Sequence, residues 1–435
     1  MTTFLSGMKS INEFLWSGPL LFLLMGTHLY FTIKLHVPQK KILEAIRLSV
    51  TPESQENTGN LSVFATLATT LAATLGTGNI IGVSTAIALG GPGAIFWCWI
   101  TGILGMATAY SECFLSVLFR KKNADGQNRG GPMYLWENGL RNKSVGKFYA
   151  LLTVVAAFGV GCTTQSNSIT QTTSASFGLS PQIAGFLAAV LCGFVIVGGI
   201  KSIGNVCVKI VPFLAVLFTA GCILLLFLNR EALLPALRLI LKSALSPGAA
   251  AGGGVGACLM LTIRYGIARG LFTNEAGIGT ASITAAASAS QNPRKQAYVS
   301  MTAVFWDTVV MCLLSGLVIV TNMILHPDSV SGISEAGLAD AAFSYLPGGN
   351  TFLSLCLVAF AITTLIGWSY LGECAVEYLA GSRGIFLYKV AYIVMIYIGA
   401  VLPLTFVWEC TDLINACMVL PNVAALLLLR KYIKG

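Results

Sequence analysis

Two glycine-rich stretches decide the fold. They are LAATLGTGNIIGVSTAIALGG at residues 71–91 and RYGIARGLFTNEAGIGTASITAAA at residues 264–287. Each is an apolar segment interrupted near its middle by glycine beside polar residues, at 76–79 in the first and at 273–277 in the second. Glycine lowers helix propensity by about 1 kcal/mol relative to alanine. Unwound backbone at membrane depth is tolerated only where protein buries it or where it lines a cavity. The stretches therefore predict two broken membrane helices.

Composition makes lipid the solvent for most of the chain. Of 435 residues, 55% are apolar and 10% are charged, against about 25% charged in a typical soluble protein. A membrane span needs about 20 helical residues, and the first apolar segment is too long for a signal peptide. We predict an all-α integral membrane protein with eleven transmembrane helices, at 13–35, 62–88, 93–119, 148–172, 182–200, 206–228, 250–285, 297–325, 351–379, 384–403 and 406–429.

The broken helices divide the chain into two halves. Each begins a set of five predicted helices, and an odd number of spans places the halves in opposite orientations. Discontinuous first helices in two inverted halves are typical of secondary transporters, although glycine in one helix alone often serves only close packing. We expect an extra N-terminal helix with its cytoplasmic connector at 1–60, a first repeat at 61–228, an extracellular interfacial segment at 229–249 and an inverted second repeat at 250–435.

The positive charge follows the membrane topology. The net charge is +9, but with the N-terminus outside and eleven alternating spans most lysines and arginines fall on the inner side, as the positive-inside rule requires. We therefore expect a bacterial-type inner-membrane protein with a cytoplasmic C-terminus and no nucleic-acid partner. The outer side keeps only Lys9, Arg230, Arg238 and Lys242.

Other functional classes find little support in the sequence. The twelve cysteines form no CxxC pair and no metal-ligand spacing, which is typical of small core residues. Three scattered histidines provide no catalytic constellation, so we expect no enzyme. An ion channel, the alternative from another class, would need rings of equivalent groups from several subunits. The sequence leaves the oligomeric state open.

Several long motifs resemble one transporter family. The stretches ATLGTGNIIGVSTAIALGGPGAIFWCWITGILGMATAYSE (73–112), GGPMYLWENGL (130–140), RGLFTNEAGIGTAS (269–282) and ITTLIGWSYLGE (362–373) resemble the alanine or glycine:cation symporter family, a branch of the leucine-transporter fold. Departures lie at Ser282 and Ile283, where relatives carry proline or histidine, and in GCTTQSNS (161–168), which lacks an asparagine before the glutamine. The resemblance implies sodium-coupled uptake of alanine or glycine, with proton coupling or serine or glutamine selectivity as alternatives.

A zwitterionic substrate requires hydrogen bonds at both of its charges, because desolvating an unpaired charge is prohibitive. Backbone N–H groups after the first break, with Gln165, suit its carboxylate. Carbonyls at the second break and the Thr364 hydroxyl suit its ammonium. Two aromatic rings would limit its size, although Phe272 and Trp368 are also compatible with simple core packing, and Gln165 with pairing to a neighbouring helix. The expected substrate-binding residues are Gly76, Thr77, Gly78, Gln165, Phe272, Thr273, Ile278, Thr364 and Trp368.

The resemblance also implies two sodium sites and no other metal or cofactor. Sodium is a hard cation that prefers oxygen ligands. One site would use backbone carbonyls near the first break and two hydroxyls of the ninth helix. The other would lie beside the substrate carboxylate, where an acidic residue in the eighth helix is a functional candidate or else a structural partner. The expected ligands are Ala73, Gly76, Thr363 and Thr364 at the first site, and Asn79, Thr273 and Asp307 at the second.

Charged residues near the second break suggest a gate. Arg269 lies about one turn before the break and would pair with Glu409 or Asp412 of the last helix to close the outer path; Arg264 is the alternative. Glu275 would either cap the inner half-helix, where its charge meets the helix dipole favourably, or carry a coupling proton. The sequence leaves both roles open.

Overall fold

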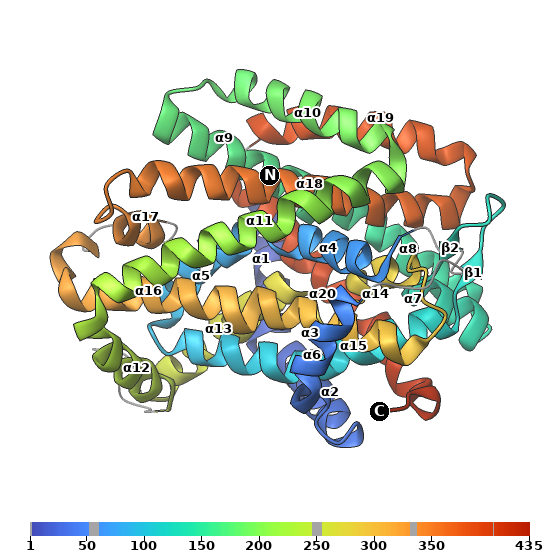
Figure 1. Ribbon diagram of the computed structural model, residues 1–435, viewed down its shortest axis with the longest axis horizontal. Helices are drawn as coiled ribbons and strands as arrows, with labels where there is room; N and C mark the ends of the chain where they lie inside the picture. Colours follow the sequence, from blue (N-terminus) through green and yellow to red (C-terminus); the bar gives the residue numbers. More distant parts are fainter. Residues whose placement is uncertain (1, 52–60, 246–254, 331–336, 403) are drawn as a thin grey trace.

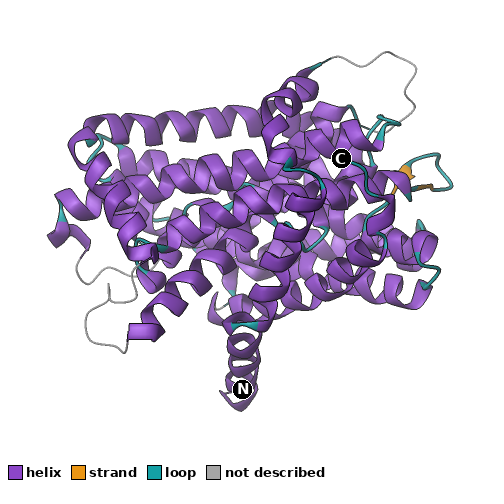
Figure 2. Ribbon diagram, turned by 90° about the horizontal axis from the view of Figure 1, so that it is seen from below, coloured by secondary structure: helices purple, strands orange, loops and turns teal. Residues whose placement is uncertain are grey.

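A computed structural model describes residues 2–51, 61–245, 255–330, 337–402 and 404–435. Long helices run side by side through most of the molecule (Figure 1). The chain begins with α1 (Thr2–Ser17) and α2 (Pro19–Lys34), which cover the predicted first span. They run at an angle to the other long helices, and α1 projects from one side of the bundle (Figure 2). The 3-10 turn η1 (Pro38–Lys41) and α3 (Ile42–Val50) follow.

The first predicted repeat opens with a helix that is broken at the predicted place. The axes of its two halves differ by 61°, and a short 3-10 turn, η2, joins them. The third helix of the repeat contains a π-helical turn, η4. The elements are α4 (Val63–Thr74), η2 (Thr77–Asn79), α5 (Ile81–Gly90), α6 (Ala94–Leu118), α8 (Lys143–Phe158), η4 (Gly159–Thr163), α9 (Thr164–Phe177), α10 (Pro181–Val197) and α11 (Gly199–Leu228).

The second break lies two residues later than predicted. α13 (Val255–Asn274) includes Thr273 and Asn274, and α14 (Thr280–Ala286) resumes after residues 275–279. The chain leaves the helix where φ becomes positive, at Glu275 (+55°), Gly277 (+98°) and Gly279 (+98°). Thr273 is polar but remains helical, because its hydroxyl donates to the carbonyl of Gly270 in the same helix.

The remaining helices of the second half are continuous, although one contains a π-helical stretch. They are α15 (Pro293–Val304), the π-helical η5 (Phe305–Cys312), α16 (Leu313–Leu325), α18 (Gly349–Ala380), α19 (Arg383–Val401) and α20 (Leu404–Leu428). The domain boundaries at residues 60, 228 and 249 stay predictions.

Short elements connect the long helices. The interfacial segment forms α12 (Arg230–Leu245), a helix with buried residues at four-residue spacing, and the others are η6 (Pro327–Val330), α17 (Leu338–Phe343) and η7 (Arg430–Tyr432). The loop before the fourth predicted span contains a hairpin of β1 (Lys121–Lys122) and β2 (Asn128–Arg129), then α7 (Pro132–Tyr134) and the π-helical η3 (Leu135–Gly139). The sequence did not predict the hairpin. An Arg129–Glu377 ion pair of 2.6 Å joins the loop to α18.

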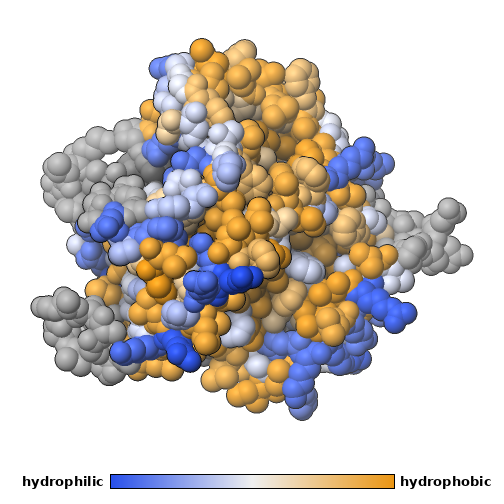
Figure 3. Space-filling model, turned by 60° about the vertical axis from the view of Figure 1, so that its left-hand side comes forward, coloured by the Kyte–Doolittle hydropathy of each residue, from blue (hydrophilic) through white to orange (hydrophobic). Residues whose placement is uncertain are grey.

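The surface is that of a multi-pass membrane protein. Within the described ranges, eight helices are long and apolar enough to cross a bilayer, and the α4–α5 pair adds a bent ninth. The exact number of eleven stays a prediction, since α10 is short and α13 begins beside the undescribed residues 246–254. Apolar side chains cover much of the face in Figure 3. Phe194 and Phe386 expose 79% and 78% of their surface, as lipid-facing residues do.

Candidate transport site

The two helix breaks touch each other. A Cβ atom built on Gly78 would lie 2.7 Å from Thr273 Cγ2 and 3.2 Å from Phe272 Cδ1. One built on Gly76 would lie 2.7 Å from the Thr364 hydroxyl of α18. Any side chain at these two positions would overlap its neighbours, so glycine allows the first break to rest against both α13 and α18.

A small buried cavity lies where the breaks meet. The space that the centre of a water-sized sphere can occupy is about 10 Å³. The cavity therefore holds about one water molecule. An amino acid therefore enters only when lining side chains move. The cavity is lined by Ala73, Thr74, Gly76, Gly78, Val160, Gln165, Phe272, Glu275, Thr364 and Trp368. Six of the nine predicted substrate residues line it, namely Gly76, Gly78, Gln165, Phe272, Thr364 and Trp368, whereas Thr77, Thr273 and Ile278 do not.

Two buried polar atoms of lining residues lack a hydrogen-bond partner among the described residues. They are Gln165 Oε1 and Trp368 Nε1. The amide nitrogen of Gln165 lies 3.4 Å from the Val160 carbonyl. An unsatisfied buried polar atom costs about 1–3 kcal/mol, so both are candidates for contact with a polar ligand.

A second polar cluster joins the first break to η5. Asn79 Nδ2 donates to Asp307 Oδ1 at 2.7 Å, and Thr308 Oγ1 donates to Asp307 Oδ2 at 2.6 Å. The Thr308 hydroxyl lies 3.2 Å from that of Thr273. All four side chains are at most 2% exposed. The structure thus brings the three residues predicted for the second sodium site together and adds Thr308, which sequence reasoning missed although it directly follows Asp307.

Residues predicted for the other sodium site lie at the opposite side of the first break. Thr364 Oγ1 donates to the Leu75 carbonyl at 3.1 Å. Ala73, Gly76 and Thr364 all line the cavity. The hydroxyl of Thr363 instead donates to the Phe360 carbonyl at 2.8 Å within α18.

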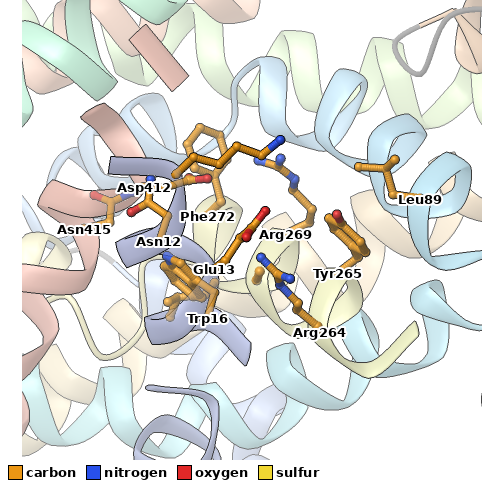
Figure 4. Close-up of a pocket in the computed structure, with 13 residues that line it drawn as sticks. Asn12, Glu13, Trp16, Leu89, Arg264, Tyr265, Arg269, Phe272, Asp412 and Asn415 are labelled. Carbon is orange, nitrogen blue, oxygen red and sulfur yellow. The ribbon is translucent and has the colours of Figure 1, made fainter. Parts of the chain in front are cut away.

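A larger cavity of about 490 Å³ lies beyond Phe272 (Figure 4). Phe272 lines both cavities. The predicted gate residues Arg269 and Asp412 also line the larger cavity, as does Arg264; the side chain of Glu409 lies outside the described residues. Sequence reasoning missed the contribution of α1, from which Lys9, Asn12, Glu13 and Trp16 reach the cavity. In Figure 4, Glu13 projects toward the two arginines.

The other side of the second break is closely packed. Glu112 Oε1 of α6 accepts from Gly277 N at 2.8 Å and from Asn422 Nδ2 at 2.6 Å. The Ile278 carbonyl accepts from Tyr149 Oη at 2.8 Å. Glu275 accepts from the hydroxyl of Thr280, the first residue of α14. That contact is with a side chain, and α14 has no side-chain cap hydrogen bond, so the capping role stays a prediction; Glu275 also lines the small cavity. Glu112 and Asn422 carried no sequence signal of this role.

Two broken helices that meet at a buried polar cavity define a secondary transporter of the leucine-transporter fold. Comparison with solved structures supports this fold. The structure of MhsT in complex with L-phenylalanine superposes with a TM-score of 0.59 at 15% sequence identity, over 85% of this chain and 89% of that one. At this identity the likeness concerns the fold alone.

The chain belongs to the sodium:alanine symporter family, whose model matches residues 1–435. It is 41% identical to the sodium/alanine symporter AgcS of Methanococcus maripaludis, over 98% of this chain and 95% of the relative. It is 35% identical to the probable sodium/glutamine symporter GlnT of Bacillus subtilis, over 97% and 87% of the two chains. The protein is therefore a membrane transporter for cation-coupled amino-acid symport, not an enzyme.

Proposed function

We propose that this protein carries a small neutral amino acid, alanine or glycine, into the cell together with sodium. The observation that carries the proposal is the contact between the two breaks beside the small cavity, where Gly76 and Gly78 bring bare backbone against Thr364, Thr273 and Phe272. Backbone groups and short side chains can satisfy both charges of a zwitterion there without a charged partner.

The substrate carboxylate would bind at the first break. The described hydrogen bonds of this turn run from Asn79 N to the Gly76 carbonyl and from Ile80 N to the Thr77 carbonyl, and they use neither the Thr77 nor the Gly78 N–H. The dipole of the following half-helix favours an anion at the same point. Gln165 would donate its side-chain N–H, which makes only a long contact of 3.4 Å with the Val160 carbonyl.

The substrate ammonium would bind at the end of α13. Backbone carbonyls of the last helical turn, near Phe272 and Thr273, lack partners within the helix, and the negative end of the helix dipole favours a cation. The Thr364 hydroxyl donates its proton to a carbonyl and keeps lone pairs that accept from an ammonium. Phe272 and Trp368 would enclose the substrate side chain, and the limited space favours alanine or glycine.

Sodium would bind on both sides of the first break. Asp307, Thr273 and Thr308 offer oxygen atoms in one buried cluster, and Asn79, whose side-chain nitrogen donates to Asp307, would offer its oxygen once its amide group turns. Among the described residues, no basic side chain pairs with Asp307, so a cation would balance its charge. The other site would use carbonyls of Ala73 and Gly76 with the hydroxyls of Thr363 and Thr364.

The larger cavity would be the outer vestibule, with the N-terminus outside and the C-terminus in the cytoplasm of a bacterial-type cell. Arg269 and Asp412 would approach further when the outer path closes, because a partly hydrated ion pair forms and breaks at little cost. Phe272 would be the last barrier before the substrate.

Uptake into proteoliposomes tests the proposal. An inward sodium gradient should drive accumulation of radiolabelled alanine or glycine above equilibrium, and replacing sodium with potassium should abolish it. Accumulation that follows an imposed pH gradient without sodium would favour proton coupling. Preference for glutamine or serine in a substrate panel would change the substrate, and conductance without accumulation would indicate a channel.

A further inference from the structure

The π-helical turn η4 touches the ring that encloses the cavity. A Cβ atom built on Gly161, at the centre of this turn, would lie 2.8 Å from Trp368 Cδ2 and still closer to Cβ and Cγ of the same residue. Real Cβ atoms essentially never approach so closely. The side chain of Trp368 therefore packs directly against backbone, and not even a methyl group fits between them.

The backbone on either side of this contact cannot easily move away. A Cβ atom on Gly367, the residue before Trp368, would lie 2.7 Å from Ala73 N, so α18 is already pressed against α4. The buried hydroxyl of Tyr392, in α19, lies 3.2 Å from the Gly161 carbonyl and 3.0 Å from the Leu365 carbonyl. By bridging these carbonyls, Tyr392 ties η4 to α18 on the other side.

A larger residue at position 161 therefore acts on the indole ring. The nearest atom, Trp368 Cβ, does not move when the side chain rotates, so an added methyl group separates η4 from α18 slightly and carries the indole ring away from η4. Trp368, Val160 and Gln165 line the same small cavity, which has room for about one water, so even a small displacement of the ring changes a large part of the available space.

We infer that Gly161 determines which substrate side chain the transporter accepts, by fixing how far Trp368 reaches into the cavity. Gly161 is a positioning residue, since it acts through Trp368. The inference rests on the proposed function in one respect, namely that Trp368 faces the substrate side chain. Tyr392 contributes to this positioning, because its hydroxyl holds the backbones of η4 and α18 together.

Gly161→Ala tests the inference, and Gly159→Ala is the matched control. Gly159 begins the same π-helical turn, but a Cβ atom there would meet its nearest neighbours, Ile414 and Thr411, at an ordinary 3.8 Å. The measurement is the ratio of the half-inhibitory concentrations of unlabelled alanine and glycine against sodium-driven uptake of labelled glycine. We expect Gly161→Ala to raise this ratio about tenfold, the effect of one methyl group in a tight pocket, and Gly159→Ala to leave it unchanged.

Two further variants keep the test decisive. Adding Trp368→Phe to Gly161→Ala should return the ratio toward the wild-type value, because phenylalanine keeps Cβ and Cγ but its smaller ring occupies less of the cavity. Tyr392→Phe should let the ring shift without added bulk and improve inhibition by 2-aminobutyrate several-fold. If Gly161→Ala is inactive, Tyr392→Phe decides alone, and unchanged inhibition by 2-aminobutyrate would overturn the inference.

An unchanged ratio in an active Gly161→Ala variant, or an equal change in Gly159→Ala, would also overturn it. Failure of the proposed function can be told apart from failure of this inference. In that case the wild-type protein itself would carry neither glycine nor alanine with sodium.

Discussion

The side-chain nitrogen of Asn79 lies 2.7 Å from a carboxylate oxygen of Asp307, so the unwound turn of the first broken helix is joined directly to the π-helical stretch of η5. The carbonyl oxygen of the same Asn79 side chain accepts from Gly76 N at 3.1 Å. One amide thus holds the shape of the break and reaches the buried acid. Occupancy of this cluster by a cation would act on the same backbone that is proposed to bind the substrate.

Replacing Asn79 with alanine should weaken sodium dependence. The change removes an oxygen ligand and the contact with Asp307, and a hydrogen bond to a charged group contributes about 1.5–3 kcal/mol. We expect the sodium concentration for half-maximal uptake to rise about tenfold or more. Asn138→Ala, in η3, is the control, because that exposed side chain donates to the Phe119 carbonyl at the end of α6. Unaltered sodium dependence in Asn79→Ala would remove it from the ion site.

Asp307→Asn should have a larger effect on sodium than on the amino acid. The substitution keeps the size of the side chain but removes the only formal charge of the cluster formed with Asn79, Thr273 and Thr308. Sodium titrations of alanine uptake should shift by more than tenfold, since a buried carboxylate is a strong ligand for a hard cation. Asp340→Asn, on the exposed face of α17, controls for general loss of acidic charge. Equal sodium titrations for both variants would show that Asp307 has only a structural role.

Gln165→Ala should weaken amino-acid binding by roughly 1–3 kcal/mol. Its side-chain nitrogen makes one long contact of 3.4 Å with the Val160 carbonyl and its oxygen has no described partner, so the substitution should mainly remove interactions with the substrate. Alanine binding at saturating sodium, measured by scintillation proximity, checks this. Gln171→Ala serves for comparison, because Gln171 lies on the same helix with an exposed side chain. Binding equal to that of the parent would place Gln165 outside the site.

Trp368→Ala should admit larger amino acids. Trp368 is 1% exposed and lines the cavity, so removing the ring opens space next to the substrate side chain. Competition by leucine or phenylalanine against labelled alanine should appear in this variant. Phe194→Ala removes an aromatic ring at the lipid-facing surface and should not change the substrate range. The same substrate range in Trp368→Ala and the parent would show that the ring encloses no substrate.

The sequence predicted the broken helices because glycine at membrane depth has a specific physical meaning. Gly76 and Gly78 mark the first break within the predicted residues. The second break came two residues late, because Thr273 and Asn274 remain helical and the positive φ values begin at Glu275. Polar side chains alone therefore did not end α13, which ends where the backbone adopts positive φ values.

Contacts between elements that lie far apart in the sequence were harder to predict. Asp307 could be singled out because an acid in a membrane helix is rare, but Thr308, with an ordinary hydroxyl, could not. The contact between Gly161 and Trp368 requires two helices more than 200 positions apart to meet at one turn, and neither residue carries a pattern that predicts the other. Ile278 was expected at the substrate but does not line the cavity. Its position depends on where the second break lies, and that break lies two residues later than predicted.

A density map of the protein with sodium and alanine bound tests the central claim most directly. We expect interrupted helices near residues 76–79 and 275–279, with density for the amino acid enclosed by Gly78, Gln165, Phe272 and Trp368 and for a cation beside Asp307. Two continuous helical rods at these positions, or alanine bound elsewhere with the small cavity empty, would contradict it.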